Sequence, residues 1–428
     1  MLMRSYLDRL TAPGAFLWAT GIECTFITDP WPKTTRMLDE YALIGHYERR
    51  DADLDLMASL GITTARYGIP WYRINPAAGT WDWDWTDRAL EGLLVRGIDP
   101  IIDLVHYGVP AWMEGAFLHP DFPHYMAEYA ARVAERYKGR IHAYTPLNEA
   151  RIAARYGGRL GWWPPYRRGG RGYVAVLLQA CRGIVWTCRA LQGVDPETVI
   201  VHVEGAELYS AAEGGLEDEV TRRQLDVFLT YDLITGQVTP AHLLWPWLRH
   251  HGASDEDLGW FVDHALTLDI VGINLYPVWS NRWLIRSACG IRSRPHYGSA
   301  AFLERLIEMF WERYRRPLMI TETASRSSLA RRCAWLDESL RGVRRLRERG
   351  IPLIGYTWYP MLDHVVWAWR QRGERALPTS LGRMGLWDIG LPSLVRVATP
   401  LVDRYRHLVC CGDEAVGPIA AQHGSPRH

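Results

Sequence analysis

The chain has 428 residues and a formal net charge of +1, from 49 basic and 48 acidic side chains. Such a balance gives no long-range field to attract nucleic acid or an anionic membrane, so we expect neither as a partner. The length permits a large buried core, either in several domains or in one α/β barrel. There are 21 Trp and 21 Tyr against 8 Phe, a preference that suits sugar stacking as well as a large core.

The N-terminal segment lacks the apolar run of a signal peptide and carries charges at Arg4, Asp8 and Arg9. No other stretch approaches 18 uninterrupted apolar residues, the length that a membrane span requires. The seven cysteines are odd in number and scattered, without a CxxC pair, which favours reduced thiols over a disulfide framework or a structural zinc. We therefore expect a cytoplasmic protein without a metal or other cofactor.

Short apolar or β-branched runs alternate with longer segments of helical periodicity from near the start to about residue 408. This alternation is typical of parallel strands covered by helices. Eight runs predict strands, at residues 15–20, 63–67, 99–104, 142–147, 198–203, 269–274, 318–321 and 353–357. Eight strands are what a closed barrel needs, so we predict an α/β fold. It is a single (β/α)8 TIM barrel over residues 1–411, followed by a disordered tail over 412–428.

The segments between these runs predict two helices and one long loop. Residues 51–61 have an apolar stripe that ends at Gly61, and residues 122–137 repeat large side chains at helical spacing. Residues 155–172 are rich in Gly, Pro, Trp and Arg, which favours an irregular loop after the fourth strand. Its aromatic residues would line the leaving-group side of a site there. Its arginines would either meet an anionic leaving group or stay solvated.

Polar residues follow the carboxyl ends of the predicted strands, which form one rim in such a barrel. They are Arg66, His106, Asn148, Glu149, Asn274, Tyr276, Glu322 and Trp358. The two glutamates are 322 − 149 = 173 residues apart, so only a fold that gathers distant strand ends would bring them together. Two carboxylates delivered in this way are what cleavage of a glycosidic bond with retention of configuration requires.

Six fragments resemble, in the same order, the motifs of glycoside hydrolase family 1, the β-glucosidase-like enzymes. They are RYGIPWYRINP at 66–76, LVHYGVP at 104–110, LNEA at 147–150, GINLY at 272–276, ITETA at 320–324 and GYTWYPMLD at 355–363. The resemblance extends from about Phe16 to Tyr405. It implies that Glu322 attacks the anomeric carbon and that Glu149 protonates the leaving oxygen, then activates water.

The resemblance also implies roles for the other strand-end residues. Arg66 and Tyr276 would lower the pKa of the nucleophile, as a cation and a donor beside a carboxylate do. Asn148 would bind the sugar 2-hydroxyl and His106 another hydroxyl of the same ring, with Asn274 nearby. Trp358 would form the stacking floor beneath the sugar.

Two sugar anchors of the family are missing from this sequence. Gly21 stands where the family's first strand brings a Gln, and Val366 stands where a Glu follows the eighth strand. Their loss predicts a sugar other than ordinary glucose. Glu23 and Glu204 are candidate replacements. A third carboxylate beside the sugar would suit an amino sugar, and the alternative is that these residues are ion-pair partners.

The sequence thus indicates a retaining β-glycosidase for a small soluble glycoside. A transglycosidase with the same two carboxylates and a non-catalytic sugar-binding barrel remain alternatives. A metal-dependent barrel hydrolase would need clustered ligands such as an HxH pair on the first strand, which the chain lacks. The sugar, the leaving group, the linkage and the oligomeric state stay open.

Overall fold

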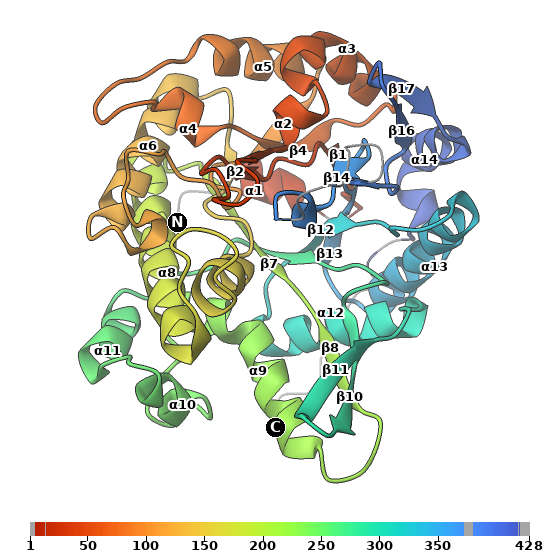
Figure 1. Cartoon of the computed structure of the whole chain (residues 1–428). Helices are drawn as coiled ribbons and strands as arrows, with labels where there is room; N and C mark the ends of the chain where they lie inside the picture. The colour runs from red at the N-terminus through yellow and green to blue at the C-terminus, as the bar shows by residue number, and fades with distance from the viewer. Residues whose placement is uncertain (1–4, 13, 372–379, 418, 420–428) are drawn as a thin grey trace.

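The computed structural model describes residues 5–12, 14–371, 380–417 and 419. Its centre is a closed barrel of eight parallel strands, in which β1 pairs with both β4 and β13 to complete the ring (Figure 1). The strands are β1 (Leu17–Gly21), β4 (Thr64–Gly68), β5 (Asp99–Asp103), β6 (Ala143–Thr145), β7 (Val199–Gly205), β9 (Ile270–Asn274), β12 (Leu318–Thr323) and β13 (Leu353–Trp358). Each predicted strand is present within two residues of its expected bounds, so the predicted (β/α)8 fold is confirmed.

Helices follow the strands and surround the barrel (Figure 1). The longer ones are α3 (His46–Ala58), α5 (Asp84–Leu94), α6 (Phe122–Tyr137), α8 (Gly169–Val194), α9 (Glu217–Ile234), α11 (Asp255–Asp263), α12 (Ala300–Tyr314), α13 (Leu329–Glu348) and α14 (Pro400–Cys411). The shorter ones include α2 (Glu40–Leu43), α4 (Trp71–Ile74), α7 (Ala150–Ala153) and α10 (Trp245–His250). The helix predicted at 122–137 has the bounds of α6, and the one predicted at 51–61 is the second half of α3 with the turn after it.

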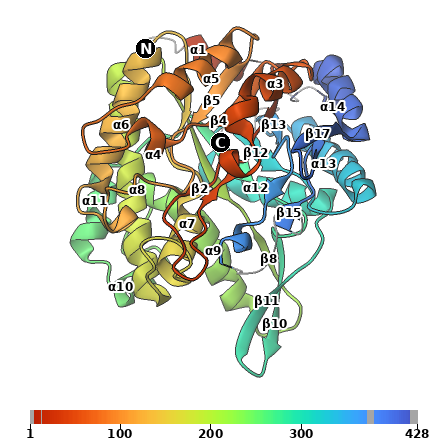
Figure 2. The same ribbon diagram turned by 45° about the horizontal axis from the view of Figure 1, so that its top comes forward.

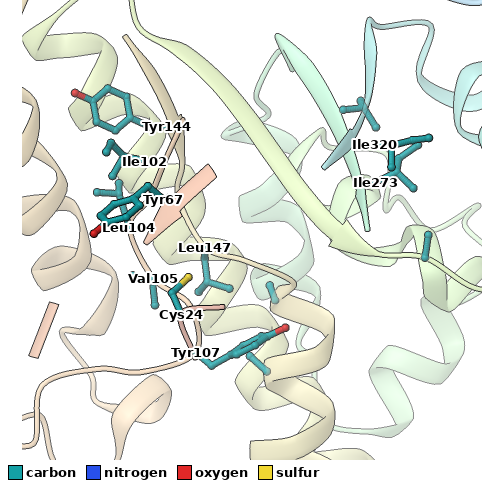
Figure 3. Close-up of a cluster of buried hydrophobic side chains, with 14 of the residues drawn as sticks. Cys24, Tyr67, Ile102, Leu104, Val105, Tyr107, Tyr144, Leu147, Ile273 and Ile320 are labelled. Atoms are coloured by element: carbon teal, nitrogen blue, oxygen red, sulfur yellow. The ribbon is translucent and has the colours of Figure 1, made fainter. Parts of the chain in front are cut away.

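Alternate residues of each strand build two separate cores. The inward set is small or aliphatic and fills the barrel with Ala19, Ile101, Ala143, Val199, Val201, Val203, Ile270, Met319 and Ile354. The next residue along a strand faces the helices, as Ile102, Tyr144, Ile273 and Ile320 do in the outer core (Figure 3). This period of two explains why the strand runs of a covered parallel barrel read as almost wholly apolar.

The N-terminal helix α1 (Ser5–Leu10) covers the barrel at the amino ends of its strands. Tyr6, Leu7 and Leu10 pack on the inward core, and the Tyr6 hydroxyl donates to Asp99 Oδ2 at 2.9 Å. Asp99 begins β5, so this contact lies at the amino ends of the strands. The opposite end, where the strands finish, is left for the site.

Additional strands project from the carboxyl-end rim. Strands β8 (Leu208–Ala211), β10 (Asn281–Ser287) and β11 (Gly290–Pro295) form a three-stranded sheet, and the β10–β11 hairpin extends away from the body (Figure 2). Three two-stranded sheets pair β2 (Phe26–Ile27) with β3 (Leu38–Asp39), β14 (His364–Val365) with β15 (Leu381–Gly382), and β16 (Trp387–Gly390) with β17 (Val395–Ala398). These insertions after β1, β7, β9 and β13 supply the walls above the barrel.

Two sequence expectations need correction. The segment 155–172 is not wholly irregular, because Ala154–Arg159 forms a π-helical turn and α8 already begins at Gly169. The tail does not start at residue 412. Residues Gly412–Ala415 form a 3-10 turn, and Arg344 Nη2 donates to the carbonyl oxygen of Ala415 at 2.9 Å. Residues 418 and 420–428 of the expected tail lie outside the described residues.

Helix α8 is the one helix among the described residues that is long and apolar enough to cross a membrane by length and composition. In its most apolar window, 67% of the residues are buried inside the protein. The helix packs against α6, and residues such as Cys181 and Ile184 have no exposed surface. Burial of this extent is what a core helix shows.

Candidate active site

A cavity of about 370 Å³ opens at the carboxyl ends of the barrel strands. Six predicted site residues line it: Glu23, His106, Glu149, Asn274, Tyr276 and Glu322. Four others, Arg66, Asn148, Glu204 and Trp358, do not. Both predicted catalytic glutamates therefore face one cavity.

Glu322 is aimed into the cavity by an irregularity in β12. The strand pairs regularly with β9 up to Ile320, and the register then shifts so that Glu322 lies opposite Asn274. Such a bulge redirects a side chain without ending the strand. The carboxylate accepts a hydrogen bond from Arg66 Nη1 at 2.6 Å and another from the Tyr276 hydroxyl at 2.5 Å. A cation and a hydroxyl donor thus hold the two oxygens.

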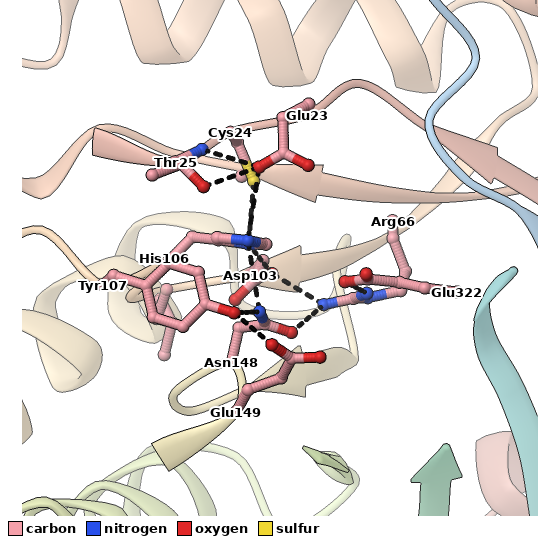
Figure 4. Close-up of polar contacts among 12 residues, drawn as sticks. Glu23, Cys24, Thr25, Arg66, Asp103, His106, Tyr107, Asn148, Glu149 and Glu322 are labelled. Carbon is pink, nitrogen blue, oxygen red and sulfur yellow. Dashed lines mark hydrogen bonds and ion pairs between the residues drawn. The ribbon is translucent and has the colours of Figure 1, made fainter. Parts of the chain in front are cut away.

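Glu149 is held in an uncommon backbone conformation just after β6. Its φ and ψ are 48° and 62°, in the left-handed region that non-glycine residues rarely occupy outside functional sites. Its Oε1 accepts from Asn274 Nδ2 at 2.9 Å, and its Oε2 accepts a short hydrogen bond from the Tyr107 hydroxyl (Figure 4). Among the described residues, no Arg, Lys or His forms an ion pair with Glu149, in contrast to Glu322 and its partner Arg66.

The two carboxyl groups differ in what controls their protonation. Burial, and then the negative charge of Glu322, raise the pKa of Glu149 to about 7. Burial also raises the pKa of Glu322, while Arg66 and the Tyr276 hydrogen bond lower it, in the direction that the sequence predicted for these two residues. In the part of the chain that the structure describes, Arg66 pairs with Glu322 and no guanidinium pairs with Glu149, which favours the ionised form at Glu322 and the protonated form at Glu149.

A buried hydrogen-bond network lies beside the two glutamates (Figure 4). Arg66 Nη2 donates to Asp103 Oδ2 at 2.7 Å, and His106 Nδ1 lies 2.9 Å from the same oxygen and 3.2 Å from Cys24 Sγ. Cys24, Asp103 and His106 are a group of metal-ligand type. Arg66 and His106 both bond to Asp103 Oδ2, so this carboxylate forms a hydrogen-bonded support for the two side chains.

The first strand contributes to the cavity through Glu23 rather than through position 21. A Cβ atom at Gly21 would lie 2.4 Å from the carbonyl oxygen of Arg66, so no larger side chain fits there. Glu23 lines the cavity, and its Oε1 lies 3.6 Å from His106 Nε2 while accepting from Thr25 Oγ1 at 2.6 Å. Val366 also lines the cavity, so the missing carboxylate after β13 leaves an apolar wall.

Arg66 and Asn148 lie beneath the cavity as supports. Asn148 has no exposed surface, and its Nδ2 lies within 3.1 Å of both His106 Nε2 and the Tyr107 hydroxyl oxygen. Its Oδ1 accepts from Arg66 Nη2 at 3.1 Å. Because both ends of the amide are engaged, the expected contact with a sugar hydroxyl is not available in this conformation.

Trp358 and Glu204 face away from the cavity. Trp358 is fully buried and donates from Nε1 to the carbonyl oxygen of Met384 at 3.0 Å. Glu204 follows the inward residue Val203 on β7, so its side chain points to the helices, where Oε2 accepts from the backbone N–H of Arg151 at 3.3 Å. Burial raises its pKa to about 8. Trp358 and Glu204 thus lie outside the cavity, whereas Glu23, the other predicted third carboxylate, lines it.

Several lining residues were missed by the sequence reasoning. They are Tyr107, Ile152, Arg155, Glu207, Trp279, Arg282, Arg326 and Trp367. Tyr107 directly follows His106 in the predicted strand-end motif, and its positive φ of 70° is not visible in a sequence. The others come from the segments after β6, β7, β9, β12 and β13, whose positions depend on loop paths. Three arginines of the predicted loop at 155–172, Arg167, Arg168 and Arg171, do not line the cavity.

Comparison of the sequence with known proteins finds similarity to one family. A family model described as glycosyl hydrolase family 1 matches residues 21–192. β-Glucosidase 47 of Arabidopsis thaliana is 34% identical over 137 residues, which are 29% of this chain and 25% of that protein. A phospho-cellobiase of Klebsiella oxytoca is 22% identical over 429 residues, covering 83% of this chain and 89% of the relative. The chain matches about a quarter of the length of the first two curated relatives.

Solved structures show the same fold over almost the whole chain. A β-glucosidase from Thermotoga maritima in complex with glucoimidazole superposes with a TM-score of 0.80 and 19% sequence identity. The superposition covers 93% of this chain and 98% of the other. This likeness establishes the barrel with its rim insertions.

Proposed function

We propose that the chain belongs to glycosyl hydrolase family 1 and is a retaining β-glycosidase acting on a small soluble glycoside. The observation that carries the proposal is the unequal pair of glutamates in one cavity. Glu322 has the cation Arg66 at 2.6 Å, and Glu149 has a pKa raised to about 7 without a cation. At the same pH a nucleophile must be ionised and an acid must be protonated, so the two carboxyl groups need different pKa values.

In the first step, a Glu322 oxygen would form a bond to the anomeric carbon while the bond from that carbon to the leaving oxygen breaks. Glu149 would transfer its proton to the leaving oxygen. In the second step, the ionised Glu149 would take a proton from water as the water oxygen attacks the same carbon. Glu322 then departs as a carboxylate, and two displacements at one carbon retain its configuration.

The residues around the pair support this division of work. Tyr276 and Arg66 would stabilise the charge that returns to Glu322 when the glycosyl–enzyme bond breaks. Asn274 donates to Glu149 from Nδ2, and its Oδ1 accepts from Thr321 Oγ1 at 2.8 Å, which orients the amide. Strands β6, β9 and β12 thereby fix both carboxyl groups on rigid elements.

We also propose that the sugar differs from ordinary glucose. Val366 gives an apolar wall, and Glu23 brings a carboxyl group beside His106. The Val366 side chain itself offers no hydrogen bond to a hydroxyl that faces it, and a site selects strongly against groups that it leaves unpaired.

The stereochemistry of the first product tests the proposal. A panel of nitrophenyl β-glycosides of different sugars, including amino sugars, would be screened for release of nitrophenol. Proton NMR of the best substrate at early times should show the β-anomer of the free sugar first. An α-anomer at early times, or no release from any sugar, would contradict the proposal. Added methanol distinguishes a transglycosidase, because its main product would be the methyl β-glycoside.

A further inference from the structure

The cavity has an arginine-rich entrance on the side of Glu149. Arg155 and Arg282 both line it, together with Glu207. We call Arg155 and Arg282 the entrance arginines. Arg155 comes from the turn after β6, six residues beyond Glu149, and Arg282 comes from β10. Two segments far apart in the chain thus bring cations to one place.

The position of this entrance relative to the catalytic pair is set by β7. A Cβ atom at Gly205 would lie 2.8 Å from Glu149 Oε1, and Glu207 follows two residues later. The wall formed by Ile152, Arg155, Ala206 and Glu207 therefore adjoins Glu149. In the proposed reaction Glu149 protonates the leaving oxygen, so the leaving group has to extend along this wall.

The carboxylates of the entrance do not neutralise the entrance arginines. Glu207 accepts a short hydrogen bond from the buried Arg151, whose Nη1 also lies 3.8 Å from Asp226 Oδ2. Arg155 Nη1 reaches only 3.7 Å from Glu207 Oε1. Arg151 thus holds Glu207 and lies near Asp226, so Glu207 compensates the charge of Arg155 only in part.

Arg282 shows this incomplete compensation most clearly. Its guanidinium donates from Nε to Ser293 Oγ at 2.7 Å and from Nη2 to the Ser293 carbonyl oxygen at 3.3 Å. Among the described residues it has no carboxylate within 4.0 Å. It is only partly exposed, so water cannot fully replace a counter-ion. A guanidinium in such a setting is a ready site for an oxyanion.

We infer that the enzyme takes glycosides whose leaving group carries an oxyanion, a carboxylate or a phosphate, which the entrance arginines bind. The inference rests on the proposed glycosidase function and extends it to the leaving group. Tyr156 and Trp279 also line the cavity and provide flat surfaces for the body of that group.

Matched substrates test this inference. The 3-carboxy-4-nitrophenyl and 3-carbamoyl-4-nitrophenyl glycosides of the best sugar differ by one negative charge at nearly equal size. The ratio of their kcat/KM values is compared between wild type and variants, so their different chemical reactivity cancels. The 3-phosphonooxy analogue, as a third substrate, distinguishes phosphate from carboxylate as the preferred oxyanion.

We expect Arg155→Gln and Arg282→Gln each to lower the preference for the charged substrate about threefold, and the double variant about tenfold. Arg282→Lys should keep most of the preference, because it keeps the charge. Added salt should weaken the preference of the wild type. Arg292→Gln, an exposed arginine of the same hairpin outside the cavity, makes the same change in net charge and should leave the ratio unaltered.

An equal ratio in wild type and the double variant would overturn the inference, provided that circular dichroism shows both to be folded. The neutral carbamoyl substrate distinguishes failure of the leaving-group inference from failure of the glycosidase proposal. If this substrate is hydrolysed but the kcat/KM ratio is the same in wild type and the double variant, the glycosidase proposal stands and the anionic leaving group is wrong. If neither substrate is hydrolysed with any sugar, the glycosidase proposal itself fails.

Discussion

The bottom of the cavity and its entrance are built by different means. At the bottom, Arg66, Asp103 and Glu322 are almost fully buried and joined by ion pairs of 2.6 and 2.7 Å on three barrel strands. At the entrance, Arg155 is 44% exposed and lies 3.7 Å from its nearest carboxylate. Rigid strand ends thus hold the reacting groups, while inserted segments supply contacts that vary without disturbing the chemistry.

The largest effect is expected at the bottom, from loss of the nucleophile. Glu322→Gly removes the group that bonds to the anomeric carbon, so kcat should fall about 10⁴-fold or more on every substrate. Glu312→Gln, an exposed glutamate on α12, is the control and should retain activity. Steady-state assays with the nitrophenyl panel measure both. Turnover within tenfold of wild type in Glu322→Gly would show that the bottom of the cavity is not where the bond forms.

Loss of the acid should depend on the leaving group. Glu149→Ala should slow substrates with poor leaving groups by about 10²- to 10³-fold and dinitrophenyl glycosides much less in the glycosylation step. Azide should restore turnover of activated substrates by attacking the glycosyl–enzyme in place of water. A plot of log(kcat/KM) against leaving-group pKa measures the difference. An equal loss on all leaving groups would remove Glu149 from its assigned role.

Glu23, at the bottom of the cavity, is expected to influence which sugar the enzyme prefers. Glu23→Gln replaces a carboxyl group by an amide of the same shape beside His106, and should lower the preference for amino sugars over neutral sugars about tenfold. The neighbouring Glu40→Gln is the control, because Glu40 is buried and does not line the cavity. An unchanged preference in Glu23→Gln would mean that Glu23 only positions His106.

The smallest expected effect is a shift in pH dependence. Glu149 must be protonated to act as the acid, so kcat/KM should fall as pH rises through about 7. Tyr107→Phe removes a hydrogen bond that stabilises the ionised form, which raises the pKa of Glu149 and should move this alkaline limb up by about 0.5 to 1 pH unit.

Tyr276→Phe makes the matched change at the other carboxylate. It removes the hydroxyl donor to Glu322 and thereby raises the pKa of that carboxyl group. The acid limb of the kcat/KM profile should therefore move to higher pH. The alkaline limb should stay in place apart from the coupling between the two glutamates. Full pH profiles of kcat/KM for both variants check the pair. If Tyr107→Phe moves the acid limb instead, the roles of the two glutamates are exchanged.

The barrel could be predicted from the strand period, and the meeting of Glu149 and Glu322 in one cavity from strand ends. The apolar runs located every barrel strand, and the two glutamates followed two of them. The side-chain alternation of β7 was available too: Val199, Val201 and Val203 fill the barrel, so His202 and Glu204 must face the helices. Applying that alternation would have excluded Glu204 from the site.

Other features of the site could not be read from the sequence. The bulge that aims Glu322 depends on pairing with β9, and the fully engaged amide of Asn148 depends on four neighbours from β4, β9 and the segment after β5. The entrance arginines come from a π-helical turn and a projecting hairpin, whose approach requires the path of the whole chain. Long-range contacts of this kind leave no periodic signal.

Trapping the glycosyl–enzyme tests the central claim most directly. The protein would be incubated with a panel of 2,4-dinitrophenyl 2-deoxy-2-fluoro-β-glycosides, and intact mass and peptide mapping would locate any adduct. The account predicts one fluoroglycosyl group per chain, attached to Glu322, formed by wild type and not by Glu322→Gly. An adduct on a different residue, or none with any sugar while nitrophenyl glycosides are hydrolysed, would contradict it.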